Sequence, residues 1–139
     1  MIAAELREAY ARSEYCVRLK DGDLVLGVGR ADAHADTRLK AGGVVRHWAV
    51  LTPCNPRSQP TFPALNQQYL DELRMALDAA AVAYLDTANR DPEGHWPDEP
   101  GFLVCDPPLG LAEELGRRFR QNALLAGTLG EPPRLVWLD

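Results

Sequence analysis

Apolar residues near the start of the chain recur first at helical spacing and then at strand spacing. Ile2, Leu6 and Tyr10 lie four residues apart, which predicts a short N-terminal helix. Two β-prone runs follow at 15–19 and 24–28, with an Asp-Gly pair between them. Because Asp-Gly is a frequent hairpin turn, these runs predict a β-hairpin.

The next segment predicts a helix, a buried strand and a loop. A weak helical pattern covers 31–41 and ends at a Gly-Gly pair, which favours a helix stop. The apolar run 47–52 is typical of a strand that is buried on both faces. Prolines then interrupt the chain repeatedly between 53 and 63 and predict a loop.

The strongest helical pattern runs from Leu65 to Ala80, with one apolar face and one polar face. We expect a strand at 82–87, a loop at 89–100 that contains three prolines, and a strand at 101–105. A loop of this length is uncommon in a compact domain, and such loops are enriched in functional residues.

The end of the chain predicts one more helix and two strands. Asp106 is suited to cap a helix and Pro107 to open it, and the apolar stripe of this helix extends to Phe119. Strands are expected at 123–126 and 135–138.

From His47 onward the expected order is β-α-β-β-α-β, which is the split βαβ arrangement of ferredoxin-like domains. We therefore predict a single α+β domain over residues 1–139 with a ferredoxin-like split βαβ core. The N-terminal helix, the β-hairpin and an extra C-terminal strand would extend or flank that core.

In that topology the strand at 101–105 lies between those at 47–52 and 82–87, so segments that are distant in sequence meet at one end of the sheet. The start of the long helix, with Asn66, falls at the same end. We expect a common cleft there, lined by Asn55, Arg57, Ser58, His95, Glu99 and Gln121.

Composition excludes several classes of function. Of the 139 residues 46% are hydrophobic and 25% are charged, which is typical of a globular protein. The net charge of −5 argues against binding to nucleic acid or to an anionic membrane surface. No apolar stretch is long enough to span a membrane, and the glutamates before Tyr15 leave no signal-peptide core. We therefore expect a cytoplasmic protein with no nucleic-acid or membrane partner, and the oligomeric state stays open.

The three cysteines, Cys16, Cys54 and Cys105, are odd in number and far apart, and no Cys-x-x-Cys pair occurs. Free thiols are therefore expected, rather than a disulfide framework or a zinc site. Cys54 follows a predicted strand and is a candidate nucleophile, with His47 or His95 as its base. The alternative, packing in the core, is the more common role of a free cysteine.

Short motifs in a fixed order add a family resemblance. They are Trp48-Ala49-Val50-Leu51-Thr52, Asn55-Pro56-Arg57-Ser58, Gly94-His95-Trp96, Glu99-Pro100 and Gln121-Asn122-Ala123. In this order they resemble a bacterial family known only as a domain of unknown function, number 3293 in that series. The similarity covers roughly residues 10–137. The resemblance implies no activity, because none is assigned to the family.

The segment Asn55-Pro56-Arg57-Ser58 lies after a predicted buried strand and before a helix. Backbone N–H groups at a helix start, with Arg57 and Ser58 nearby, are a natural site for an anion. We therefore predict ligand binding by Asn55, Arg57, Ser58, Asn66 and Gln121, with Arg57 positioning an anionic group. The alternative is that Asn55 and Ser58 form turns and that Arg57 is a solvated charge.

Carboxylates and a histidine gather in the long loop, as Asp91, Glu93, His95 and Glu99. Glu99 and His95 are the candidates for acid–base catalysis. A metal ion needs ligands in fixed geometry, and the prolines of the loop prevent a helix that would provide it. We therefore expect no metal and no other cofactor. Trp96 is interpreted as an anchor that pins the loop to the core.

Two classes of function remain. One is a small-molecule site, catalytic or only binding, at the 55–58, 91–99 and Gln121 end of the sheet, with a small anionic molecule as the candidate ligand. The other is a protein-interaction or regulatory module whose loops only stabilise the fold. A closed polar pocket between the loops would favour the first class, and a flat apolar patch the second. The many polar side chains in these loops favour the first.

Overall fold

The protein is built from short strands and four helices, and the computed structural model describes residues 2–138. The strands are β1 (Glu14–Leu19), β2 (Gly22–Gly27), β3 (His47–Leu51), β4 (Tyr84–Arg90), β5 (Glu99–Cys105), β6 (Ala123–Thr128) and β7 (Arg134–Trp137). The helices are α1 (Ala4–Arg12), α2 (Ala33–Ala41), α3 (Pro63–Ala79) and α4 (Leu111–Arg118), with a 3-10 turn η1 (Pro56–Ser58). The expected helices and strands are present within this range, with bounds that differ by a few residues.

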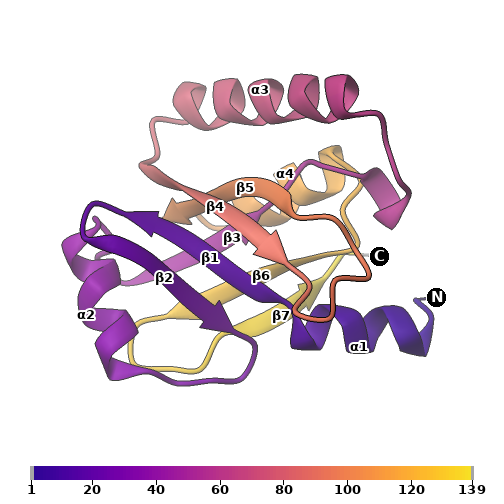
Figure 1. Cartoon of the computed structure of the whole chain (residues 1–139). Helices are drawn as coiled ribbons and strands as arrows, with labels where there is room; N and C mark the ends of the chain where they lie inside the picture. Colours follow the sequence, from indigo (N-terminus) through magenta and orange to yellow (C-terminus); the bar gives the residue numbers. More distant parts are fainter. Residues whose placement is uncertain (1, 139) are drawn as a thin grey trace.

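All seven strands form one curled sheet (Figure 1). Their order is β2-β1-β4-β5-β3-β6-β7, and each pair of neighbours is antiparallel. The loops beyond β2 and before β7 touch where the Gly29 N–H donates to the Pro133 carbonyl at 2.8 Å. The two edges of the sheet therefore approach one another, and the sheet has the shape of a half-barrel.

The expected ferredoxin-like split βαβ core is wrong. Strand β5 does lie between β3 and β4, and β6 lies beside β3, but these four strands are only the middle of the sheet. The hairpin continues the sheet through β1, which pairs with β4, and β7 continues it beyond β6. The physical reason is that β4 and β6 each leave one edge unpaired, and β1 and β7 satisfy the hydrogen bonds of these edges.

The two faces of the sheet carry separate hydrophobic cores. The first lies on the concave face, where Leu39 of α2 packs with residues of β1 to β6 that include Val17 and Leu103. The second lies on the other face, where α3 and α4 cover the sheet with Leu77 and Leu115. The central strands are therefore buried on both faces, as the apolar run at 47–52 predicts.

The expected capping of the last helix by Asp106 is also wrong. Helix α4 begins only at Leu111. The Asp106 carboxylate instead accepts hydrogen bonds from the backbone N–H groups of Val45, Arg46 and His47, at 2.7 to 3.0 Å. Asp106 therefore joins the end of β5 to the start of β3.

Helix α1 lies across one end of the curled sheet, beside the loop that joins β4 to β5 (Figure 1). The Tyr10 ring packs edge-on against Trp137 of β7, with centroids 5.2 Å apart. The Arg7 guanidinium lies 4.5 Å from the centroid of the same indole. Since α1 leads directly into β1, it bridges from one side of the sheet to the other. No helix in the described range is long and apolar enough to cross a membrane.

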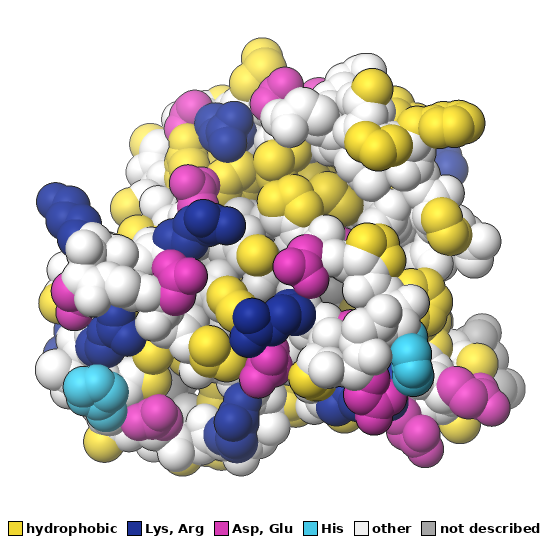
Figure 2. Space-filling model, in the orientation of Figure 1, with side chains coloured by type: hydrophobic (Ala, Val, Ile, Leu, Met, Phe, Trp, Pro, Cys, Tyr) yellow, Lys and Arg dark blue, Asp and Glu magenta, His cyan; other side chains and the backbone are white. Residues whose placement is uncertain are grey.

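The outer face of β1, β2 and β4 is solvated. Figure 2 shows charged side chains of both signs spread over this face, and hydrophobic side chains gathered in a hollow below α3. Arg18, Asp23 and Asp86 are exposed there. The charges on this face alternate in sign and form no patch of one sign.

Candidate functional site

A pocket of about 400 Å³ opens where β4 ends and β5 begins. Its walls come from α1, from the segment 54–63, from the first turns of α3 and from the loop 91–98. The apolar part of the wall consists of Leu6, Ala9, Pro60, Pro63, Leu70, Trp96, Pro97 and Pro100. The polar part includes Tyr10, Asn55, Ser58, Asn66, Asn89 and Glu99. This volume and this mixture are typical of sites that bind small molecules.

Glu99, the first residue of β5, is placed in the pocket by the register of the sheet. It lies directly opposite Asn89 of β4, and Asn89 lies opposite Tyr15 of β1. Directly opposed residues in antiparallel strands project from the same face. Since Tyr15 belongs to the core on the concave face, Glu99 and Asn89 also face the concave side.

The Glu99 carboxylate has one hydrogen-bond donor and no countercharge. Its Oε2 accepts a hydrogen bond from Asn55 Nδ2 at 2.7 Å. No Lys, Arg or His in the described part of the chain forms an ion pair with it. Burial raises the pKa of Glu99 above the ordinary glutamate value, and the hydrogen bond from Asn55 opposes this effect.

A reciprocal pair of amides fixes Asn55. The Asn55 N–H donates to Asn66 Oδ1 at 2.9 Å, and Asn66 Nδ2 donates back to Asn55 Oδ1 at 2.9 Å. The Thr61 N–H also donates to Asn55 Oδ1, at 3.0 Å. The Oδ1 atom is thus occupied by two donors, which leaves Nδ2 directed at Glu99.

The backbone around Asn55 adopts a conformation that few residues other than glycine tolerate. Asn55, Arg57 and Ser58 have φ angles of 47°, 58° and 59°. Two hydrogen bonds hold this shape: Arg57 N–H to the Arg120 carbonyl at 2.7 Å, and Ser58 N–H to the Asn55 carbonyl at 2.8 Å. Strained backbone that the surroundings hold in place is concentrated at functional sites.

A hydroxyl pair joins α1 to this segment. Tyr10 Oη and Ser58 Oγ are 2.9 Å apart, and Asn122 Nδ2 donates to Ser58 Oγ at 2.9 Å. Burial raises the pKa of Tyr10, and the bond to Ser58 opposes this, so the phenol is neutral at pH 7. No base is hydrogen-bonded to Ser58 in the described residues, and Ser58 therefore lacks the activation that a nucleophilic serine needs.

Four of the residues predicted from the sequence line the pocket together: Asn55, Ser58, Asn66 and Glu99. Glu99 and Asn55 are in direct contact, and Asn66 holds Asn55 in place. Ser58 lines the same pocket and contacts Tyr10.

The other three predicted residues lie at the same end but do not line the pocket. The Arg57 side chain is exposed. His95 is also exposed, with 66% of its side-chain surface accessible, and its Nδ1 lies 3.5 Å from the Glu93 carboxylate. Gln121 is buried behind the pocket, where Nε2 donates to the carbonyls of Cys54 and Phe119 at 3.1 and 3.2 Å.

The contribution of α1 to the site does not follow from the sequence. The sequence pattern places Tyr10 only in an apolar helical stripe. It places Asn89, from another part of the chain, only in the long loop. A hydroxyl group within an apolar stripe is the one signal that distinguishes Tyr10 from a core residue. Trp96, which the sequence indicates as an anchor of the loop, lines the pocket and is 41% exposed.

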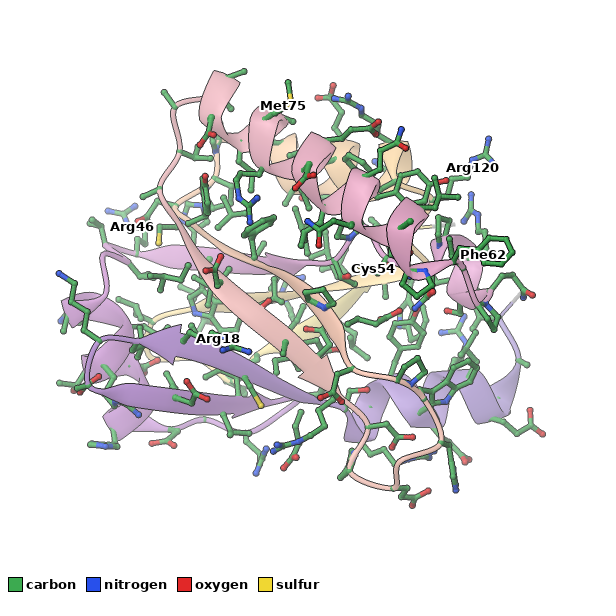
Figure 3. The ribbon with its side chains drawn as sticks, turned by 45° about the horizontal axis from the view of Figure 1, so that its top comes forward. Arg18, Arg46, Cys54, Phe62, Met75 and Arg120 are labelled. Carbon is green, nitrogen blue, oxygen red and sulfur yellow. The ribbon has the colours of Figure 1, made fainter. Side chains whose placement is uncertain are left out.

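The geometry argues against Cys54 as a nucleophile. Figure 3 shows Cys54 in the interior, while Phe62 and Arg120 project outward at the same end of the molecule. Cys54 is 2% exposed, and burial raises the pKa of its thiol to about 11. Within residues 2–138, no group of three or more His, Cys, Asp or Glu side chains is arranged to hold a metal ion.

The raised pKa of Glu99 predicts how stability depends on pH. A carboxyl whose pKa is higher in the folded than in the unfolded state makes the folded state bind more protons. Its contribution therefore lowers stability as the pH rises from the unfolded pKa, about 4.3, through the folded pKa. We expect the stability of Glu99→Gln, measured by urea unfolding relative to the wild type, to increase as the pH rises from 4 to 8.

The matched control for this prediction is Glu131→Gln, since Glu131 is exposed. Its stability relative to the wild type should not change in that direction over the same pH range. If the stability of Glu99→Gln relative to the wild type stays constant or falls as the pH rises, this result would contradict the burial of Glu99.

Comparison with known proteins identifies a family whose description assigns no function. A family model described as "Protein of unknown function (DUF3293)" matches residues 51–124, slightly more than half of the chain. The matched range contains η1, α3, the loop 91–98 and Glu99, but not α1 or β1. No curated protein and no solved structure shows significant similarity to the chain.

Proposed function

We propose a function for the chain, which belongs to the DUF3293 family. It binds a small, largely apolar molecule in the pocket beside α1, and Glu99 exchanges a proton with that molecule or forms a hydrogen bond to it. The family description assigns no activity, so the proposal is based on the site alone.

The observation that carries the proposal is the Glu99 carboxyl, which lies partly buried at a mainly apolar pocket with Asn55 as its one hydrogen-bond donor. Removal of a carboxylate from water without a countercharge costs free energy. A neutral glutamine could accept the same hydrogen bond from Asn55, so packing alone does not require an acid there. Titratable groups that burial perturbs within a cleft are concentrated at functional sites.

The position of the pocket supports a small-molecule site over an interaction module. It lies between the segment 54–63, the loop 91–98 and α1, and all three contribute residues to its wall. Among the candidates for acid–base chemistry, only Glu99 lines it. We place this function in the cytoplasm, because Cys16, Cys54 and Cys105 are free thiols.

The test is ligand binding observed by NMR. Benzyl alcohol, benzylamine and benzoate serve as neutral, cationic and anionic aromatic probes. We expect at least one of them to shift the Trp96 indole signal and the side-chain amide signals of Asn55 and Asn66 in a saturable titration. These groups line the pocket, and a bound ring would change their environment.

Two neighbouring residues on α3 provide a matched pair of variants. Gln67 lines the pocket and Gln68 does not, and both side chains are exposed. Gln67→Trp should fill the mouth of the pocket and weaken probe binding at least about tenfold, while Gln68→Trp should bind as the wild type does. The proposal fails if no probe shifts these signals, or if both variants bind equally well.

A further inference from the structure

The pocket contains hydrogen-bond acceptors that no donor satisfies. Glu99 accepts one hydrogen bond, at Oε2, and its Oε1 has no donor among the described residues. Asn89, directly opposite Glu99 in the sheet, has a buried Oδ1 without a hydrogen-bond partner. Buried polar atoms are nearly always paired in folded proteins, which makes the unpaired Asn89 Oδ1 unusual. Glu99 Oε1 is not fully buried, so it is the acceptor that a ligand in the pocket can reach.

The charged residues of the pocket wall also leave an excess of negative charge. The wall contains Asp91, Asp98 and Glu99, but a single basic residue, Arg90. Asp91 forms an ion pair with Arg12 of α1, at 3.7 Å, so the wall charges without a partner among the described residues are those of Asp98 and Glu99. The Arg90 guanidinium donates to the Glu14 carboxylate at 2.9 Å and is therefore already paired. No basic side chain of the wall is left to neutralise Glu99.

The titratable groups that face Glu99 from the surrounding elements are also acids. They are Tyr10 from α1, Tyr15 from β1 and Cys54 from the segment after β3. Burial raises the pKa of each of them, so all three are uncharged at neutral pH. They can donate hydrogen bonds but cannot balance the charge of the carboxylate.

We infer that the ligand of this pocket carries a protonated amine, which donates to Glu99 Oε1 and supplies the missing positive charge. The inference rests on the proposed function and specifies the chemical class of its ligand. The remainder of the ligand is apolar, because Leu6, Leu70 and Trp96 line the same pocket. An ammonium group placed at Glu99 would convert an uncompensated, partly buried charge into an ion pair.

Benzylamine and benzyl alcohol test this inference, because the two probes have nearly the same shape and differ in charge. Dissociation constants are measured by NMR titration of the wild type and of Glu99→Gln at pH 7.5. For the wild type we expect benzylamine to bind at least about tenfold more tightly, as a hydrogen bond to a charged group predicts. In Glu99→Gln the two constants should agree within about threefold.

The pH dependence of the wild type provides a second readout that needs no variant. Because burial raises the pKa of Glu99, lowering the pH from 7.5 toward the pKa of its carboxyl increases the protonated fraction. Benzylamine should therefore bind progressively more weakly as the pH falls, while benzyl alcohol should be unaffected.

Each further outcome has a distinct meaning. If benzyl alcohol or benzoate binds in the same pocket as tightly as benzylamine, or more tightly, the amine assignment is overturned and the proposed function stands. Binding of none of the three probes would overturn both.

Discussion

Replacing Asn55 by aspartate is expected to destabilise the protein by about 2–4 kcal/mol at pH 7.5. The change replaces the amide that donates to Glu99 at 2.7 Å with a second carboxylate, so that two like charges face each other in a partly buried site. The introduced carboxylate could still accept the hydrogen bonds that Thr61 and Asn66 donate to Asn55 Oδ1 in the wild type. The effect therefore reports on the contact with Glu99 rather than on the loop.

The pH dependence of this variant should be steep. Two neighbouring carboxyls can share one proton, and this raises the upper pKa of the pair in the folded state. Stability is then retained at low pH and lost as the pH rises through that value. Urea unfolding at pH 5 and pH 7.5 should show a much larger deficit at pH 7.5.

The double variant Asn55→Asp with Glu99→Gln is the matched control. It reverses the donor and the acceptor, because the introduced glutamine amide can donate to the introduced aspartate carboxylate, and it should recover most of the lost stability. A single variant Asn55→Asp as stable as the wild type at pH 7.5 would contradict the buried contact between Asn55 and Glu99.

The second large effect is expected at Gly101, where β3 and β5 approach closely. A Cβ atom at this position would lie 2.2 Å from the Leu51 carbonyl oxygen and 3.1 Å from Thr52 Cα. Both atoms belong to the backbone, so the clash cannot be relieved by rotating a side chain. Gly101→Ala should therefore cost about 2–4 kcal/mol, measured by urea unfolding, because the two strands must separate.

Gly101 also affects the site, because the residue before it, Pro100, holds the chain in place where it leaves β3. Thr52 Oγ1 donates to the Pro100 carbonyl at 2.8 Å, and this contact aligns the segment of Asn55 with Glu99. Gly94→Ala is the control, because nothing lies within 4 Å of a Cβ atom there, although its φ of 73° makes the substitution mildly unfavourable. If Gly101→Ala is at least as stable as Gly94→Ala, this result would contradict the close approach of β3 and β5.

The helices and strands could be predicted from the sequence because their signals are local. The apolar run at 47–52 and the stripe of α3 each determine the burial of their own segment. The extent of the sheet could not be predicted, since periodicity shows that a strand has a buried face but not which strand pairs with it. Strand β1 pairs with β4, which is far away in sequence, and no local pattern encodes that choice.

The site could be predicted in part for a similar reason. Asn55, Ser58, Asn66 and Glu99 lie near the ends of elements that the strand order brings together. The outward position of Arg57 could not be predicted, because its left-handed backbone directs the N–H, rather than the side chain, to a structural partner. Tyr10 could not be assigned to the site because helical spacing does not distinguish a stripe that faces a core from one that faces a pocket.

The most direct test of the proposed site is the titration of the Glu99 carboxyl carbon by NMR, in the free protein and with saturating benzylamine. We expect Glu99 in the free protein to titrate above the ordinary glutamate value, and its pKa to fall when the amine is bound. Glu99 that titrates together with the exposed glutamates, and that does not respond to benzylamine, would contradict both the buried carboxyl and its amine ligand.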